Sequence, residues 1–256
     1  AVVGGGPAGM QAALTLLERG HEVVLFEKEP VLGGNLVAAA SMDLKQDMKD
    51  YLEYIRRTVM KSGADIRLGT TATADTIKEL APDALIIAVG ADPRIPQVPG
   101  INLPHVRWAA DADMGKCEVG ERVAIIGGGS LGLESAVTQS SRGKKVRVFE
   151  ILPQLSGDTA ELVPMLEKNG GEILTSRRLI AVHPDRIVCT VIGTDAVEEY
   201  ECDTVLVSAG LVSRSKTAAE LRRLLPETEV CIAGDAKQPR SLGDAVHDGF
   251  NAALNI

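Results

Sequence analysis

Short apolar runs alternate with amphipathic stretches along most of the chain. A short run of aliphatic or β-branched residues predicts a buried strand, and apolar residues three or four positions apart predict a helix. Before residue 93, the patterns predict strands at 2–3, 23–26, 66–68, 71–73 and 84–89 and helices at 7–19 and 43–62. Beyond residue 104, they predict strands at 123–126, 146–149, 204–208 and 230–233, with others of mixed polarity, and helices at 133–142, 163–169 and 241–253. This alternation predicts an α/β fold with parallel sheets.

A proline-rich connector separates two similar halves of the pattern. Pro93, Pro96, Pro99 and Pro104 interrupt any regular structure there. After them, the order of strand, glycine turn, helix, strand and acidic residue occurs a second time, about 123 residues further on. We interpret this duplication as two α/β domains of the same kind, the second inserted into the first. The expected boundaries are 1–112 and 226–256 for the first domain and 113–225 for the second.

The composition excludes several classes of protein. Hydrophobic residues make up 45% and charged residues 24%, as in ordinary globular proteins rather than disordered, collagen-like or coiled-coil chains. The net charge of −8 argues against nucleic-acid or anionic-membrane partners, which need clustered Lys and Arg. No apolar stretch approaches the ~18–20 residues that cross a bilayer. The start shows no secretory signal, so we expect a cytoplasmic protein.

The four cysteines, Cys117, Cys189, Cys202 and Cys231, form no Cys-x-x-Cys pair and match no zinc or iron–sulfur spacing. They are expected to be free thiols in a reducing compartment, and no metal site is predicted. The chain opens on Ala1-Val2-Val3 without Met. We expect it to begin partway into its first strand, either as a domain of a longer polypeptide or with its first residues missing.

The first glycine turn carries a dinucleotide-binding fingerprint. Gly4 allows the tight turn, Gly6 lets the backbone approach a pyrophosphate, and Gly9 lets the helix pack closely on the strand. The start of the helix then offers free N–H groups and a partial positive charge to the phosphates. Glu27 lies 18 residues beyond Gly9, where a carboxylate can accept hydrogen bonds from the ribose hydroxyls of an adenosine.

The second turn repeats the whole spacing, with Gly127, Gly129 and Gly132 followed by Glu150. A carboxylate at Glu150 disfavours the 2′-phosphate of NADPH, so NADH is the favoured cofactor. Basic residues lie close by in the sequence and keep NADPH open as the alternative; they are Lys144, Lys145 and Arg147.

Features outside the repeat assign the two cofactors. Only the first acid is followed by a second glycine turn, Gly33-Gly34. A late strand ends at Gly234-Asp235, where the Asp can bind a ribityl hydroxyl and the Gly allows close approach to a pyrophosphate. These features favour FAD at the first turn. We therefore expect two Rossmann-like dinucleotide-binding domains, an FAD-binding domain formed by 1–112 and 226–256 and an NAD(P)-binding domain at 113–225.

Together these motifs resemble the FAD/NAD(P)-binding pyridine nucleotide oxidoreductase superfamily. Within it, 32–40, 54–57 and 244–253 resemble the C-terminal reductase portion of 2,4-dienoyl-CoA reductases, enoate reductases, Old Yellow Enzyme-type NADH oxidases and trimethylamine dehydrogenase. The resemblance implies an FMN-binding barrel and a 4Fe-4S cluster upstream in the same polypeptide. The chain departs from the family at Val89, where Thr is common, and at 211–214, where Pro-Asn is common.

The resemblance also implies the residues that contact each cofactor. For FAD, or ADP in its place, they are Gly4, Gly6, Pro7, Ala8, Gly9, Glu27, Lys28, Gly34, Asn35, Leu36, Ala72, Ala88, Gly90, Gly234, Asp235 and Ala245. For NADH they are Gly127, Gly129, Ser130, Leu131, Glu150 and Gly210.

Two hypotheses about function follow. The first is an electron-entry module, an NAD(P)H-dependent flavin oxidoreductase in which NADH passes a hydride to FAD and electrons continue to the upstream domain. No side-chain acid or base is required for this transfer, so no catalytic residue is predicted. The second is a structural domain that binds ADP or another adenine nucleotide and has no redox activity of its own.

Overall fold

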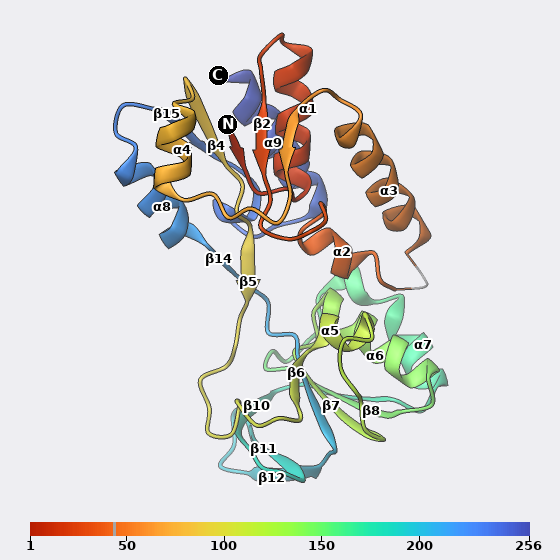
Figure 1. Cartoon of the computed structure of the whole chain (residues 1–256). Coiled ribbons are helices and arrows are strands. Elements are labelled where there is room, and N and C mark those ends of the chain that lie inside the picture. Colours follow the sequence, from red (N-terminus) through yellow and green to blue (C-terminus); the bar gives the residue numbers. More distant parts are fainter. Residues whose placement is uncertain (43–44) are drawn as a thin grey trace. The chain divides into compact units, whose positions relative to one another are not determined.

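The computed structural model describes residues 1–42 and 45–256 and divides into two compact units (Figure 1). The first unit contains Ala1–Ala40, Lys45–Asp92 and Leu211–Ile256, and the second consists mainly of Pro93–Gly210. The chain therefore leaves the first unit, builds the second and returns. The division falls at 92/93 and 210/211, whereas the sequence suggested 112/113 and 225/226. Which nucleotide each unit binds stays a prediction.

The first unit is built on a five-stranded parallel sheet in the order β15-β4-β1-β2-β3. Its strands are β1 (Val2–Val3), β2 (Val24–Phe26), β3 (Asp65–Arg67), β4 (Ala84–Ile87) and β15 (Glu229–Ile232). Its helices are α1 (Pro7–Glu18), α2 (Asn35–Ala39), α3 (Gln46–Met60), α4 (Ala74–Leu80), α8 (Ser215–Leu224) and α9 (Leu242–Leu254), with a short 3₁₀ turn, η2 (Gly234–Ala236).

Helices cover both faces of this sheet because successive side chains of a strand point to opposite sides. Val2 and Ile86 belong to the cluster formed with α1, α3 and α9. Their neighbours Val3 and Ile87 belong to the cluster formed with α4 and α8. Strands buried on both faces explain the continuous apolar runs in the sequence.

The second unit has a parallel sheet in the order β6-β13-β7-β8-β9. Its strands are β6 (Val106–Trp108), β7 (Arg122–Ile126), β8 (Lys145–Phe149), β9 (Glu172–Leu174) and β13 (Thr204–Val207). Helices α5 (Ala109–Asp113), α6 (Ser130–Ser141) and α7 (Leu162–Lys168) pack on one face, and η1 (Gly157–Thr159) is a short 3₁₀ turn. The other face packs against an antiparallel sheet of β10 (Arg177–Val182), β11 (Arg186–Val191) and β12 (Val197–Glu201).

Two parallel sheets with helical crossovers confirm the α/β class predicted from the sequence. The chain passes out of the first unit along β5 (Ala91–Pro93) and returns along β14 (Leu211–Ser213), and these two strands pair with each other (Figure 1). Pro93 therefore ends a short strand, whereas the sequence analysis placed it in an irregular connector.

Several local predictions were wrong or incomplete. The expected strand at 71–73 does not form; instead Thr73 caps α4, its hydroxyl accepting a hydrogen bond from the Thr76 N–H, which lies 3.2 Å away. The structure also contains helices that the sequence analysis did not predict, namely α2, α4, α5 and α8. The helix expected at 43–62 is observed as Gln46–Met60, and the predicted start at Asp43 lies outside the described residues.

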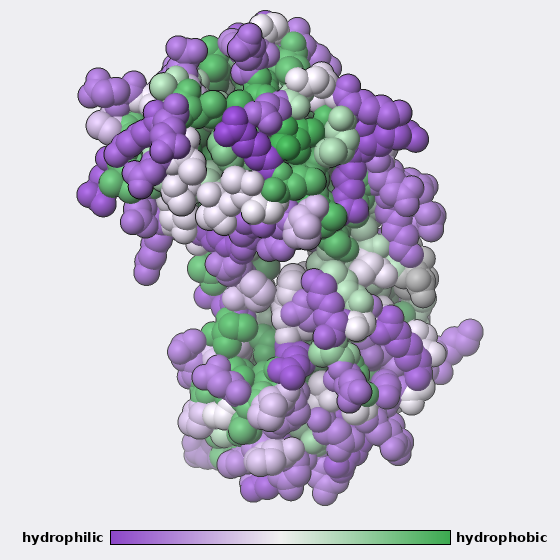
Figure 2. All heavy atoms as spheres, in the orientation of Figure 1, coloured by the Kyte–Doolittle hydropathy of each residue, from purple (hydrophilic) through white to green (hydrophobic). Residues whose placement is uncertain are grey.

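Hydrophobic residues reach the surface in scattered areas among charged ones on the face shown in Figure 2. Within the described ranges, no helix combines the length and apolar character needed to cross a membrane.

Candidate dinucleotide-binding sites

The first glycine turn joins β1 to α1, and two of its glycines are required by the fold itself. Gly4 has a positive φ of 107°, and a Cβ built on it lies 2.3 Å from the Ala88 carbonyl oxygen. A Cβ on Gly9 would lie 1.8 Å from the carbonyl oxygen of Gly4. Both contacts are with backbone atoms, which no side-chain rotation can relieve. The helix therefore approaches the strand at a distance that only glycine permits.

Gly6 is different, because the fold does not require a glycine there. Its φ of −75° and ψ of −177° are extended backbone that any residue adopts. Within the described part of the chain, the atom nearest to a Cβ on Gly6 is the Gly34 Cα, at 4.0 Å. Gly34 has a φ of 52°, and its own Cβ would lie 3.1 Å from the Gly6 Cα. The turn at 4–9 thus meets the turn at 33–34 beside a space that a side chain on Gly6 could enter.

This space lies at the start of α1. Gly6 is the N-cap residue and has no side chain that could cap the helix, and Pro7 occupies the first turn. The N–H groups of the first turn are therefore available to an anion, and the helix dipole favours negative charge there. A pyrophosphate fits this chemistry.

Glu27 fastens the turn to the end of β2. Its Oε2 accepts a hydrogen bond from the Gly5 N–H at 2.7 Å, and its Oε1 accepts one from the Glu29 N–H at 2.8 Å. The residue is only 6% exposed. The predicted ribose-binding acid therefore lies at the glycine turn. The middle glycine, Gly5, was overlooked in the sequence although both turns carry a glycine there.

The second turn reproduces this arrangement between β7 and α6. Glu150, 8% exposed, accepts from the Gly128 N–H at 2.6 Å and from the Leu152 N–H at 2.8 Å. A Cβ on Gly132 would lie 1.9 Å from the carbonyl oxygen of Gly127. Two segments about 123 residues apart in the sequence therefore fold into closely similar turns, each with its acid in place.

The N-cap position of the second turn is open as well. Gly129 has a φ of −73° and a ψ of −178°. Apart from the backbone of the helix itself and the residues next to Gly129 in the chain, no described residue has an atom within 4 Å of a Cβ built there. This space lies at the N-terminal end of α6, where the helix dipole favours negative charge, as at the first turn.

The residues after the two acids differ. Lys28 and Glu29 follow Glu27, whereas Ile151 and Leu152 follow Glu150 and are 46% and 60% exposed. Two apolar side chains beside a carboxylate offer an adenine ring a surface and offer a 2′-phosphate no cation.

The closing turn of the first unit lies against the start of α1. Gly234 has a φ of 62°, and a Cβ on it would lie 2.7 Å from the Cβ of Ala8 and 3.8 Å from that of Ala245. Burial raises the pKa of Asp235, and a hydrogen bond with the Asn35 side chain acts in the opposite direction. The structure thus brings together several of the predicted FAD contacts from three distant segments.

Other predicted contacts lie less directly in this space. The side chain of Leu36 is buried with Leu52 and Ala40, so only its backbone can reach a ligand. Ala72 packs against the cluster on the α4 and α8 side of the sheet. Leu131 likewise packs against the core of the second unit. The assignment of all these residues as nucleotide contacts stays a prediction, and so do the contacts predicted for Lys28, Gly90, Ser130 and Gly210.

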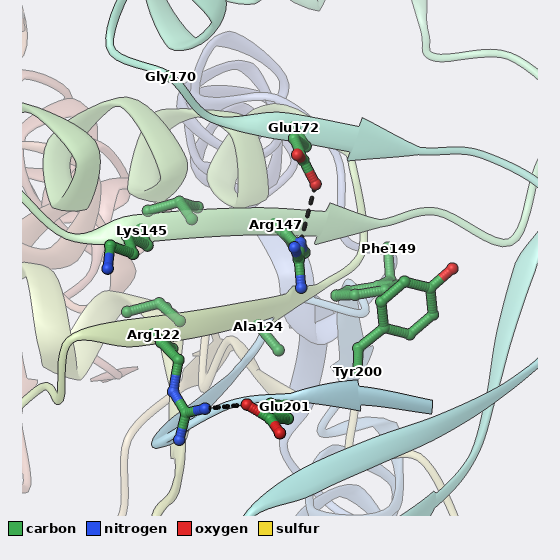
Figure 3. Close-up of a pocket in the computed structure, with 11 residues that line it drawn as sticks. Arg122, Ala124, Lys145, Arg147, Phe149, Gly170, Glu172, Tyr200 and Glu201 are labelled. Atoms are coloured by element: carbon green, nitrogen blue, oxygen red, sulfur yellow. Dashed lines mark hydrogen bonds and ion pairs between the residues drawn. The ribbon is translucent and has the colours of Figure 1, made fainter. Parts of the chain in front are cut away.

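A hollow in the second unit lies away from its glycine turn. It has a volume of about 310 Å³ and lies over the amino-terminal ends of β7 and β8, whereas the glycine turn follows the carboxyl end of β7 (Figure 3). Its three cations are already paired: Arg147 Nε with Glu172 Oε2 at 2.8 Å, Lys145 with Glu121, and Arg122 with Glu201. Tyr200 closes one side by packing edge-on against Phe149. This hollow holds no excess of charge for a phosphate.

The cysteines provide no thiol site. All four lie in the described residues and are free. Burial raises the pKa of Cys189 to about 12 and that of Cys202 to about 11, so neither is a reactive thiolate.

Two glycine turns, each on a parallel sheet and each bound by an acid at the end of the next strand, are typical of proteins that bind two dinucleotides. A family model described as "Pyridine nucleotide-disulphide oxidoreductase" matches residues 1–228. The chain belongs to this family, whose members bind FAD and NAD(P).

Named relatives are oxidoreductases of greater length. The chain is 31% identical over 266 residues to an NADH oxidase of Thermoanaerobacter brockii, covering 100% of this chain and 40% of that protein. It is 30% identical over 263 residues to a cinnamate reductase of Clostridium sporogenes, covering 100% and 39%. Among solved structures, a 2-naphthoyl-CoA reductase in complex with 2-naphthoyl-CoA superposes with a TM-score of 0.91 at 30% identity, covering 100% and 39%. The chain thus spans about 40% of the length of these relatives.

Proposed function

We propose that this chain is an NADH-dependent flavin oxidoreductase module that binds FAD at the first glycine turn and NADH at the second. FAD, when bound, supplies a ring that accepts a hydride and can release electrons singly. The chain's own residues bind the two nucleotides, orient them and exclude water. No side chain is assigned as a catalytic acid or base, because a hydride moves without one.

The observation that carries the proposal is the duplicated position of the acids. Glu27 and Glu150 each accept one backbone N–H of their own glycine turn and one from the residue two positions after the acid. An ionised carboxylate has about four acceptor positions, so each acid retains capacity for the hydroxyls of a ribose. The backbone bonds hold the carboxylate in one orientation before a ligand arrives. Such preorganisation lowers the entropy cost of binding.

The surroundings of Glu150 support NADH over NADPH. The basic residues that kept NADPH open are engaged elsewhere. Arg147 pairs with Glu172, Lys145 with Glu121 at 2.9 Å, and the Lys144 Nζ donates to the Val119 carbonyl at 2.9 Å. A 2′-phosphate beside Glu150 would therefore face a carboxylate without a free cation to offset it.

We propose further that the electrons leave for a domain outside this chain. The relatives are about two and a half times as long as the part that matches, which leaves room for an acceptor domain. The family resemblance makes an upstream FMN-binding barrel with a 4Fe-4S cluster the proposed acceptor. The free cysteines fit the reducing environment of the cytoplasm.

Anaerobic reduction of the FAD-loaded chain tests the proposal. The protein is incubated with FAD, freed of excess, and titrated with NADH or NADPH while the visible absorbance of the oxidised flavin is followed. We expect NADH to bleach the flavin, NADPH to act more slowly, and ferricyanide to restore the absorbance. A chain that takes up no FAD but is stabilised by ADP against heat would instead support the nucleotide-binding structural domain.

A further inference from the structure

Arg214 holds the backbone at the end of β4. It follows β14 and caps the start of α8, and its side chain is 28% exposed. Its Nη1 donates to the Val89 carbonyl at 2.7 Å, its backbone N–H donates to the Gly90 carbonyl at 3.1 Å, and its Nε donates to Asp92 Oδ1 at 2.9 Å. One residue thus binds three groups on a segment more than 120 positions earlier in the sequence.

The segment that Arg214 holds borders the first glycine turn. A Cβ on Gly4 would lie 3.2 Å from the Val89 backbone nitrogen. The next carbonyl, that of Ala91, accepts a hydrogen bond from the Asn35 Nδ2 at 3.4 Å. Three consecutive carbonyls at this strand end are therefore engaged, two by Arg214 and one by Asn35.

Ser213 extends the same connection to the closing turn. Its hydroxyl donates to the Ala236 carbonyl at 2.6 Å, at the end of η2. That 3₁₀ turn contains Asp235, which shares a hydrogen bond with Asn35. Ser213 and Arg214 therefore tie the end of β4 to the turn after β15, and Asn35 links the same two segments from the other side.

The charge arrangement favours an arginine at this position. The hydrogen bond from Arg214 lowers the pKa of Asp92, and the nearby charge of Lys28 acts in the same direction. Guanidinium N–H groups lie in one plane and can serve the carbonyl of Val89 and the carboxylate of Asp92 together. A lysine ammonium, a point charge on a flexible stem, does not reproduce this fixed geometry.

We infer that Ser213 and Arg214 are positioning residues for the flavin half of FAD, because they set the backbone at 89–92 and at 234–236. The inference rests on the proposed function, in which Glu27 binds the adenosine ribose and Gly90, Gly234 and Asp235 contact the rest of the dinucleotide. Neither residue touches the cofactor in this role. The sequence showed them only as a departure from the Pro-Asn common in the family.

Comparing FAD with ADP separates this role from a general structural one. Dissociation constants of both ligands are measured by titration calorimetry for the full chain and for Arg214→Met, Arg214→Lys and Ser213→Ala. The matched control is Arg186→Met, which removes a half-exposed arginine paired with Asp185 at 2.9 Å in the second unit. Melting temperatures of the ligand-free proteins are recorded in parallel.

We expect Arg214→Met to raise the Kd for FAD by at least about tenfold, while the Kd for ADP stays within about twofold. The Kd of Arg214→Lys for FAD should lie between those of the parent chain and Arg214→Met. Ser213→Ala should raise this Kd by less than Arg214→Met does, and the control should bind FAD as the parent chain does. Unchanged FAD affinity, or equal weakening of FAD and ADP, would overturn the inference while the proposed function stands. Failure of the parent chain to bind FAD would overturn the proposed function itself.

Discussion

Replacing Gly129 with alanine should separate the glycine that the ligand needs from the glycine that the fold needs. Gly129 lies at the start of α6 in ordinary extended backbone, and no described atom outside the helix backbone and the adjoining residues comes within 4 Å of a Cβ built on it. Gly132, one turn further along the helix, would place its Cβ 1.9 Å from the Gly127 carbonyl oxygen. Both substitutions add one methyl group, which enters open space at Gly129 and collides with backbone at Gly132.

The expected stabilities follow from these distances. At Gly129, alanine is a poorer N-cap than glycine and costs some tenths of a kcal/mol of stability. It also lowers the conformational entropy of the unfolded chain, which stabilises the fold by about 0.4–1 kcal/mol. The melting temperature should stay within about 2 °C. At Gly132, the Cβ requires the helix and strand to separate by roughly 1 Å, and overpacking of this kind costs about 1–3 kcal/mol. Its melting temperature should fall by about 2–12 °C.

Gly129→Ala, which should hardly change stability, should strongly weaken the binding of NADH. The methyl group of Gly129→Ala occupies the space proposed for the NADH pyrophosphate, so the Kd for NADH should rise at least about tenfold. FAD affinity should be unchanged, because the first turn is intact. Calorimetric titration with each nucleotide and a thermal melt of the free protein check both expectations. Parental NADH affinity in Gly129→Ala, or a loss of stability equal to that of Gly132→Ala, would refute the reasoning.

Three further predictions concern acids. Glu27→Gln should weaken FAD and ADP but spare NADH, and Glu150→Gln should do the reverse. Each should also lower stability by about 1–3 kcal/mol, because the amide oxygen accepts one of the two backbone N–H groups while the amide nitrogen faces the other and cannot accept it. Arg122 lowers the pKa of Asp203 from 3.8 to about 2, so this carboxylate stabilises the fold above pH 3.8 and the contribution disappears as the pH falls through 2. Asp203→Asn should therefore flatten the acid side of a plot of urea midpoint against pH, and a slope equal to that of the parent chain would contradict this. Burial raises the pKa of Asp113, so its effect on stability depends on pH in the opposite direction. The fold loses stability as the pH rises above 3.8, because the buried carboxyl ionises less readily than in the unfolded chain. Asp113→Asn should therefore raise the urea midpoint at pH 7 and leave it unchanged near pH 3.

The repeated turns were predictable because their chemistry is local. Each turn needs three residues at fixed positions along the chain. They are a glycine that permits a close backbone approach, another glycine one helical turn further, and an acid at the end of the next strand. Glu27 and Glu150 lie where the spacing indicated, each bound to the N–H of its own turn. The strands buried on both faces were equally clear, because nothing but apolar side chains fits there.

Short helices were harder to predict for a physical reason. Helices α2 and α5 contain five residues each and α4 contains seven. A helical period needs a window of about eleven residues or more to stand out. At α4, the threonines that look like a strand act instead as an N-cap, since the Thr73 hydroxyl accepts from the backbone of the first turn.

The sequence by itself therefore determined the class of fold, the two dinucleotide turns and the acid assigned to each, because these depend on backbone geometry within about 25 residues. Only the tertiary structure showed that Gly6 and Gly129 border open space while Gly9 and Gly132 contact backbone. It alone revealed Arg214, whose partners lie 122 and 125 positions away. A hydrogen bond across that separation leaves no periodic pattern in the chain, because it depends on where the fold brings the two segments together.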